Sequence, residues 1–188
     1  MRTSRVFVDS NNLASRTLRD WLFLIQQDSP GLYTTHTSFD VLVEAVRVRR
    51  RLHPKANGSL TSRFRDTLRE NLNEVLEEFP GNVAFDGDDP DDHHVHAASL
   101  ACRADMMLTD NYRDFGNPDA LPYEVFSSDD FFLLVQDSAP QSVHRAVLTQ
   151  SEYWQRFSNS KPLDVALRDA GCPLFASRVA HHLERAKR

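Results

Sequence analysis

The chain has 188 residues, of which 40% are hydrophobic and 26% are charged, and these values are ordinary for a globular protein in water. The formal net charge of −5 argues against a protein that holds nucleic acid mainly through a strong positive field. It does not exclude a nuclease, because an acidic site can recruit divalent cations that supply positive charge.

The two cysteines and the apolar runs indicate where the protein works. Cys102 and Cys172 form no Cys-x-x-Cys pair and are too few for a disulfide scaffold, so we expect a reduced, cytoplasmic setting. The first apolar run, residues 6–8, is too short for a signal peptide. No segment approaches the roughly 18 apolar residues of a membrane span, so a soluble protein without membrane contact is expected.

The N-terminal part of the chain predicts a βαβ unit. Residues 5–8 form a β-branched and aromatic run that is typical of a buried parallel strand, and turn-forming residues follow at 9–12. Residues 16–27 carry apolar side chains at helical spacing, and residues 32–35 predict a second strand. The sheet is therefore expected to be parallel, with a right-handed crossover.

Ser38 is a good N-cap for a helix that runs to about residue 51. We expect four apolar residues to form its buried stripe: Phe39, Leu42, Val43 and Val46. The remaining elements are helices at residues 62–79 and 93–103, a strand at 83–85, further strands at 105–109 and 123–126, and a helical tail that begins at a Ser128 cap. Breaks are expected in the tail at Pro162 and at residues 171–173.

This order predicts an α/β fold with a central parallel sheet. We expect one domain at residues 1–137 and a helical C-terminal extension at 138–188. The extension carries enough apolar side chains to require a surface to pack against. It could pack on the main domain, or it could form a surface that binds a partner protein or a second copy of the chain.

Several acidic residues are predicted to meet at one edge of this sheet. Asp9 ends the first strand, Asp110 and Asp114 follow a later one, and Asp92 opens the helix before that strand. Glu44 lies on the helix after the second strand, on the side that carries Arg47 and Arg51. Converging carboxylates repel each other unless a cation lies between them, and oxygen ligands suit Mg²⁺ or Mn²⁺.

Each acid also has a simpler structural interpretation. Asp92 could cap its helix, where the helix dipole favours negative charge, and Glu44 could pair with Arg47 or Arg51 at the surface. Arg47 and Arg51 could simply occupy the C-terminal part of their helix, where the helix dipole favours positive charge. Alternatively, they could guide RNA phosphates or the acidic tail of an inhibitor towards the site.

Three stretches resemble the motifs of PIN-domain nucleases and keep their order. They are residues 6–13 (VFVDSNNL), 92–99 (DHHVHAAS) and 106–115 (MMLTDNYRDF). Glu44 matches the usual place of the second acid of that family. The resemblance covers about residues 4–135, and the helical extension is similar to that of a branch of bacterial PIN proteins related to VapC toxins. Asn12 departs from the family, which usually has a hydrophobic residue there.

This resemblance implies a three-layer α/β/α sandwich with a central parallel sheet, and a Mg²⁺- or Mn²⁺-dependent endoribonuclease. The metal-binding and catalytic quartet implied is Asp9, Glu44, Asp92 and Asp114. Asp110 is implied as a further ligand that competes with Asp114 for the fourth place. Auxiliary roles fall to three polar residues: Asn11, Thr109 and Asn111.

The implied role is the toxin of a type II toxin–antitoxin pair, with a small antitoxin protein and a homodimer as expected partners. Structured or single-stranded looped RNA is the expected substrate, since its backbone and bases can reach a recessed site. A housekeeping RNA-processing nuclease and a catalytically silent RNA- or protein-binding module of the same fold remain alternatives.

Other metal and phosphate sites have less support in the sequence. Residues 92–94 match one motif of a second phosphoesterase family, whose other motifs are missing. A zinc site built from His93, His94 and His96 lacks cysteine partners nearby. Asn11 replaces the second acid that a phosphoaspartyl phosphatase needs, and no nucleotide-binding glycine loop is present.

Overall fold

The computed structural model describes residues 3–158 and 160–186. The chain folds into two compact units. Unit 1 comprises residues 1–14 and 33–127, and unit 2 comprises residues 15–32 and 128–188. A domain boundary at residue 137 stays a prediction. The two compact units are divided at other residues, because the helical segment within residues 15–32 belongs to the same unit as the C-terminal helices.

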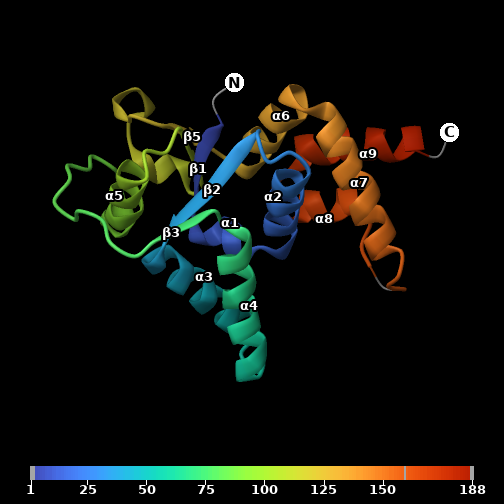
Figure 1. Cartoon of the computed structure of the whole chain (residues 1–188), viewed down its shortest axis with the longest axis horizontal. Helices are drawn as coiled ribbons and strands as arrows, with labels where there is room; N and C mark the ends of the chain where they lie inside the picture. The colour runs from blue at the N-terminus through green and yellow to red at the C-terminus, as the bar shows by residue number, and fades with distance from the viewer. Residues whose placement is uncertain (1–2, 159, 187–188) are drawn as a thin grey trace. The chain divides into compact units, whose positions relative to one another are not determined.

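Unit 1 is built on a five-stranded sheet in which all strands are parallel (Figure 1). The spatial order is β3-β2-β1-β4-β5. The strands are β1 (Ser4–Val8), β2 (Tyr33–Ser38), β3 (Glu74–Leu76), β4 (Met106–Leu108) and β5 (Glu124–Phe126). The predicted α/β class with a central parallel sheet is therefore confirmed. The chain reverses its direction of travel across the sheet between β1 and β4, which makes the carboxyl ends of these two strands a topological switch point.

Four α-helices accompany this sheet in unit 1. They are α1 (Ser10–Ala14), α3 (Phe39–Leu52), α4 (Gly58–Asn71) and α5 (His93–Ala101). Ser38 caps α3 as predicted, because its side chain accepts a hydrogen bond from the backbone N–H of Val41. The small side chains of α5 are buried, as expected for a helix packed closely.

Three predictions about this region are wrong. The buried face of α3 is formed by Val41, Leu42 and Ala45, whereas Phe39 and Val43 are 41% and 47% exposed. The expected helix at residues 62–79 ends at Asn71, and the strand expected at 83–85 lies instead at 74–76. Asn73 explains this change, because its backbone N–H donates to Thr35 O at 2.9 Å and its side chain accepts from Thr35 N at 2.8 Å. These bonds join the segment to β2, and pairing with a sheet overrides helical periodicity.

Unit 2 is helical. It contains α2 (Arg16–Asp28), α6 (Ser128–Ser138), α7 (Pro140–Trp154), α8 (Leu163–Asp169) and α9 (Pro173–Ala186). The predicted breaks at Pro162 and at residues 171–173 are confirmed. Trp21 of α2 meets Phe175 of α9 edge-on at 5.4 Å between ring centroids, and Phe132 of α6 stacks on Phe175 at 5.0 Å. These buried rings form the centre of the unit.

Both cysteines are free and buried, Cys102 in unit 1 and Cys172 in unit 2. None of the helices within the described ranges combines the length and the apolar character that a membrane crossing requires.

Candidate metal centre

The candidate site begins where β1 and β4 end side by side. The backbone N–H of Asp9 donates to the carbonyl of Leu108 at 3.0 Å, which continues the pairing of the two strands by one residue. The apolar run before Asp9 is fully buried, so the strand carries this carboxylate into the protein, where only 3% of the residue is exposed. Burial raises the pKa of Asp9, and the nearby carboxylate of Glu44 raises it further.

Hydrogen bonds hold Asp9 at this edge. The hydroxyl of Thr109 donates to Asp9 Oδ2 at 2.7 Å, and the backbone N–H of Ser10 donates to Oδ1 at 2.5 Å. Thr109 Oγ1 in turn accepts from the backbone N–H of Asn111 at 3.1 Å and from Asn11 Nδ2 at 3.4 Å. The three residues predicted to be auxiliary therefore meet in one network, which fixes the direction of the Asp9 carboxylate.

Three further carboxylates gather next to it. Asp89, Asp92 and Asp114 each place an oxygen within 4.8 Å of the others. Asp92 Oδ2 is buried and has no hydrogen-bond partner in the described structure. Burial raises the pKa of Asp92 to about 7, and the negative charges of Asp9, Asp89 and Asp114 add to this effect.

These features fit a bound divalent cation. A buried carboxylate oxygen without a partner is costly, and carboxylates this close repel each other in their charged form. A hard cation among the oxygens would supply the missing partner and compensate the repulsion. An all-oxygen donor set suits Mg²⁺ or Mn²⁺.

Two glycines allow the loop before α5 to bring Asp89 and Asp92 to this place. The backbone N–H of Asp88 donates to the carbonyl of Asp114 at 2.8 Å. A Cβ on Gly87 would lie 2.6 Å from that same carbonyl, and a Cβ on Gly116 would lie 2.7 Å from the carbonyl of Asp86. Only residues without a side chain let the two backbone segments approach so closely.

Glu44 reaches the site from α3 and is paired with a histidine. Its Oε1 lies 3.2 Å from His94 Nε2, and His94 Nδ1 donates to the carbonyl of Asp91 at 2.7 Å. This contact with His94 is the largest cause that lowers the pKa of Glu44. The same contact raises the pKa of His94 to about 9. At neutral pH the two side chains form an ion pair, and within the described structure Glu44 makes no ion pair with Arg47 or Arg51.

The structure separates the two candidates for the fourth acid. Asp114 lies in the short 3-10 helix η2 (Tyr112–Phe115) and joins the carboxylate cluster, whereas Asp110 is exposed and outside it. Asp92 makes no side-chain capping bond to α5, so capping does not explain its place. Arg47 and Arg51 are exposed on α3, and the positive charge of Arg47 helps to lower the pKa of Glu44.

The three neighbouring histidines point to different partners. His93 bonds the carbonyl of Val83 at 2.9 Å, His96 bonds the hydroxyl of Tyr123 at 2.6 Å, and His94 pairs with Glu44. Among the described residues they form no shared metal site, since the grouping that could hold an ion contains only acids.

The sequence pattern did not single out Asp89 or assign His94 a role in the site. Asp89 belongs to an acid-rich run at residues 86–92, which could have drawn attention to it, but nothing local says which acid of that run faces Asp114. His94 stands one turn after Asp91 and two residues after Asp92, and only the packing of α5 against its neighbours brings it to Glu44. No family model matches this chain, and no curated protein matches it.

Proposed function

We propose that this protein is a Mg²⁺- or Mn²⁺-dependent endoribonuclease with a PIN-like, three-layer α/β/α nuclease fold. The observation that carries the proposal is the buried, partnerless Asp92 Oδ2 within a group of carboxylates at the carboxyl ends of β1 and β4. Active sites of open parallel sheets form at such an edge.

Asp89, Asp92 and Asp114 would hold the cation, with Asp9 beside them. When bound, a divalent cation supplies a nucleophilic water and stabilises charge on the phosphodiester oxygens. The Thr109 hydroxyl keeps the Asp9 carboxylate in one orientation. His94 keeps Glu44 ionised close to Asp9, so Glu44 would add negative charge at the edge where the cation binds.

The test is cleavage of total RNA with Mg²⁺ or Mn²⁺ titrated into metal-free protein, followed by mapping of the cut ends. We expect cleavage that requires the cation and is lost in Asp92→Asn and Asp114→Asn. Asp110→Asn is the matched control, because it removes an equal charge from a neighbouring exposed position, and it should retain activity. Folded wild-type protein that cuts no RNA at any metal concentration would leave a silent binding module instead.

We further propose that the nuclease acts as the toxin of a toxin–antitoxin pair, in line with the resemblance of residues 6–13, 92–99 and 106–115 to VapC-like proteins. Induced expression should then arrest growth, and co-expression of a small protein encoded next to its gene should restore it. Metal-dependent cleavage of one RNA precursor without growth arrest would favour the housekeeping role.

A further inference from the structure

The basic residues of this acidic chain are concentrated in one hairpin. Residues 45–65, which contain the end of α3, the connecting loop and the first half of α4, hold seven of the 22 Lys and Arg and none of the 27 Asp and Glu. The rest of the chain therefore has 15 basic and 27 acidic residues, a formal charge of −12. We call this segment, residues 45–65, the basic hairpin.

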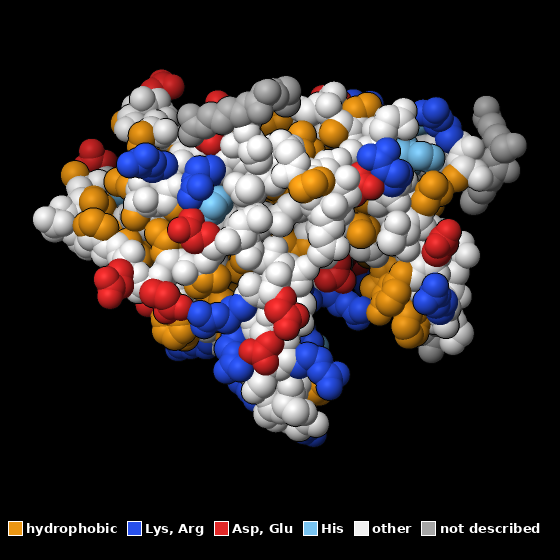
Figure 2. Space-filling model, viewed as in Figure 1, with side chains coloured by type: hydrophobic (Ala, Val, Ile, Leu, Met, Phe, Trp, Pro, Cys, Tyr) orange, Lys and Arg blue, Asp and Glu red, His pale blue; other side chains and the backbone are white. Residues whose placement is uncertain are grey.

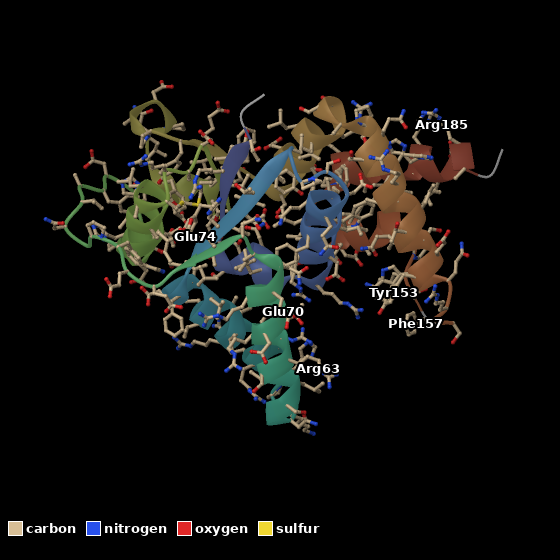
Figure 3. All side chains as sticks on the ribbon, in the orientation of Figure 1. Arg63, Glu70, Glu74, Tyr153, Phe157 and Arg185 are labelled. Carbon is tan, nitrogen blue, oxygen red and sulfur yellow. The ribbon has the colours of Figure 1, made fainter. Side chains whose placement is uncertain are left out.

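The basic hairpin lies on unit 1 as a projecting pair of helices. α3 and α4 pack against each other, and Figure 1 shows the free end of α4, where the helix begins, directed away from the sheet. Figure 2 shows Lys and Arg side chains on both sides of this end. Arg63 lies near the free end and Glu70 nearer the sheet, as labelled in Figure 3. The positive charge is thus presented at the part of the hairpin that solvent reaches.

Some of these cations have structural partners, and others have none. Arg50 donates to the carbonyl of Ala56 and, at 2.7 Å, to Thr61 Oγ1, which ties the two helices together. The guanidinium of Arg49 lies 4.9 Å from the ring centroid of Phe64. In contrast, Arg51, Lys55 and Arg63 are exposed and make no ion pair within the described structure.

Folding alone does not explain this arrangement. The dipole of α3 favours positive charge in its last turn, at Arg49, Arg50 and Arg51. It does not favour Lys55 in the loop or Arg63 in the first half of α4. Arg65 is paired with Asp66, which directly follows the segment, at 2.6 Å, but the exposed cations without such a partner repel each other. An anionic ligand would compensate that repulsion.

The free end also has a place for a phosphate group. A hollow of about 400 Å³ lies between the helices and is lined by Arg49, Arg50, His53, Lys55, Leu60 and Thr61. Arg49 and Arg50 are held by the contacts described above, so Lys55 is the lining cation that remains available, and its ammonium group can bind phosphate oxygens.

We propose that the basic hairpin binds the phosphate backbone of single-stranded RNA, independently of base sequence, outside the carboxylate cluster. This inference rests on the proposed function for the identity of the polymer. The charge distribution supplies the reason, because the carboxylate cluster repels RNA when it holds no cation, and the hairpin provides the opposite charge on the same unit. Arg51, Lys55 and Arg63 are the contacts that the structure leaves available.

The test measures binding of wild-type protein to a labelled oligouridine of about 20 nucleotides in EDTA, between about 50 and 200 mM salt. The variant is Arg51→Gln/Lys55→Gln/Arg63→Gln. The matched control is Arg156→Gln/Arg178→Gln/Arg185→Gln, which removes the same charge from exposed positions of unit 2. Thermal melting verifies that both variants fold.

Each lost phosphate contact on a single strand lowers the slope of log affinity against log salt by about 0.7, so the hairpin variant should lose about 2. Its affinity at low salt should fall about tenfold or more. Equal binding by wild type and hairpin variant would overturn the proposal. An equal loss of RNA affinity in the unit 2 control would also overturn it, because the net charge of the protein, and not the hairpin, would then explain the binding. Tighter binding of polyglutamate than of RNA would replace it with an acidic protein partner.

Because these measurements use EDTA, they do not depend on catalysis. Hairpin-dependent RNA binding without metal-dependent cleavage would support the hairpin and refute the nuclease. Metal-dependent cleavage without hairpin-dependent RNA binding would support the nuclease and refute the role of the hairpin.

Discussion

Replacing Gly116 with alanine should weaken both the fold of unit 1 and its affinity for a divalent cation. Gly116 has φ 70° and ψ −140°, a conformation close to one that is essentially reserved for glycine. The added Cβ would lie 2.7 Å from the carbonyl oxygen of Asp86, so one of the two segments must move. That movement would displace the loop that carries Asp89 from Asp114.

The structure supplies a control for the backbone part of this effect. Gly171 also has a positive φ, 86°, but a Cβ there would meet nothing within 4 Å. It ends α8 in a Schellman motif, in which Cys172 N donates to Leu167 O at 2.9 Å and Gly171 N to Arg168 O at 3.1 Å. Gly171→Ala should therefore show only the conformational cost, about 1–2 kcal/mol.

Gly116→Ala adds a steric conflict to a conformational cost of about 1–3 kcal/mol, so a total of about 2–4 kcal/mol is expected. For a chain of this size, 1 kcal/mol lowers Tm by about 2–4 °C. Calorimetry with and without Mn²⁺ measures both effects: Gly116→Ala should lose more stability than Gly171→Ala, and Mn²⁺ should raise its Tm less than that of wild type. An equal or smaller loss than the control, with an unchanged response to Mn²⁺, would refute the reasoning.

Three more substitutions test the hydrogen bonds, charges and core. Thr109→Val removes the donor to Asp9 and should cost about 1.5–3 kcal/mol in urea unfolding, whereas Thr109→Ser should keep the bond and most of the stability. Arg145 binds both carboxylate oxygens of Asp28, at 2.8 and 2.7 Å, and lowers its pKa. This stabilisation is present above the unfolded pKa and is lost as the pH falls through the lowered folded pKa. Arg145→Met should therefore destabilise at pH near 7, and its difference from wild type should shrink as the pH is lowered from about 4. A difference that does not shrink in acid would show that charge is not the cause. Phe175→Ala should cost about 3–5 kcal/mol, because this ring is fully buried between two others, and a loss below about 1 kcal/mol would contradict the packing of unit 2.

Local signals in the sequence were enough to predict most of the sheet and the helix starts. The buried strand before Asp9 is a continuous apolar run, and Ser38 has the side chain that an N-cap needs. Long-range contacts decided the parts that were predicted wrongly. α3 buries Val41 and Ala45 rather than Val43, and it packs against α1, α4 and β2, partners that a helical wheel alone does not identify.

The same distinction applies to the candidate site. Asp9, Asp92 and Asp114 stand next to strand or helix ends, so their sequence positions predicted a common edge. Asp89 is held locally, because its side chain accepts from the backbone N–H of Asp91 at 2.9 Å, but its approach to Asp114 also depends on the long-range backbone contact of Asp88 with Asp114. Asp110 has the more obvious position after β4, but the turn of η2 leaves it in solvent and carries Asp114 inward.

The membership of α2 in unit 2 has a consequence for how this protein could be divided or recombined. The chain passes from one unit to the other three times, after residues 14, 32 and 127. A gene fusion or proteolytic cut near residue 137 would thus release the C-terminal helices from the helix that carries Trp21, a side chain now only 2% exposed. The freed surfaces would be large and apolar, which favours aggregation over two working halves. An exchange of the C-terminal helices between proteins would therefore have to move α2 with them, although most of unit 1 lies between the two pieces in the sequence.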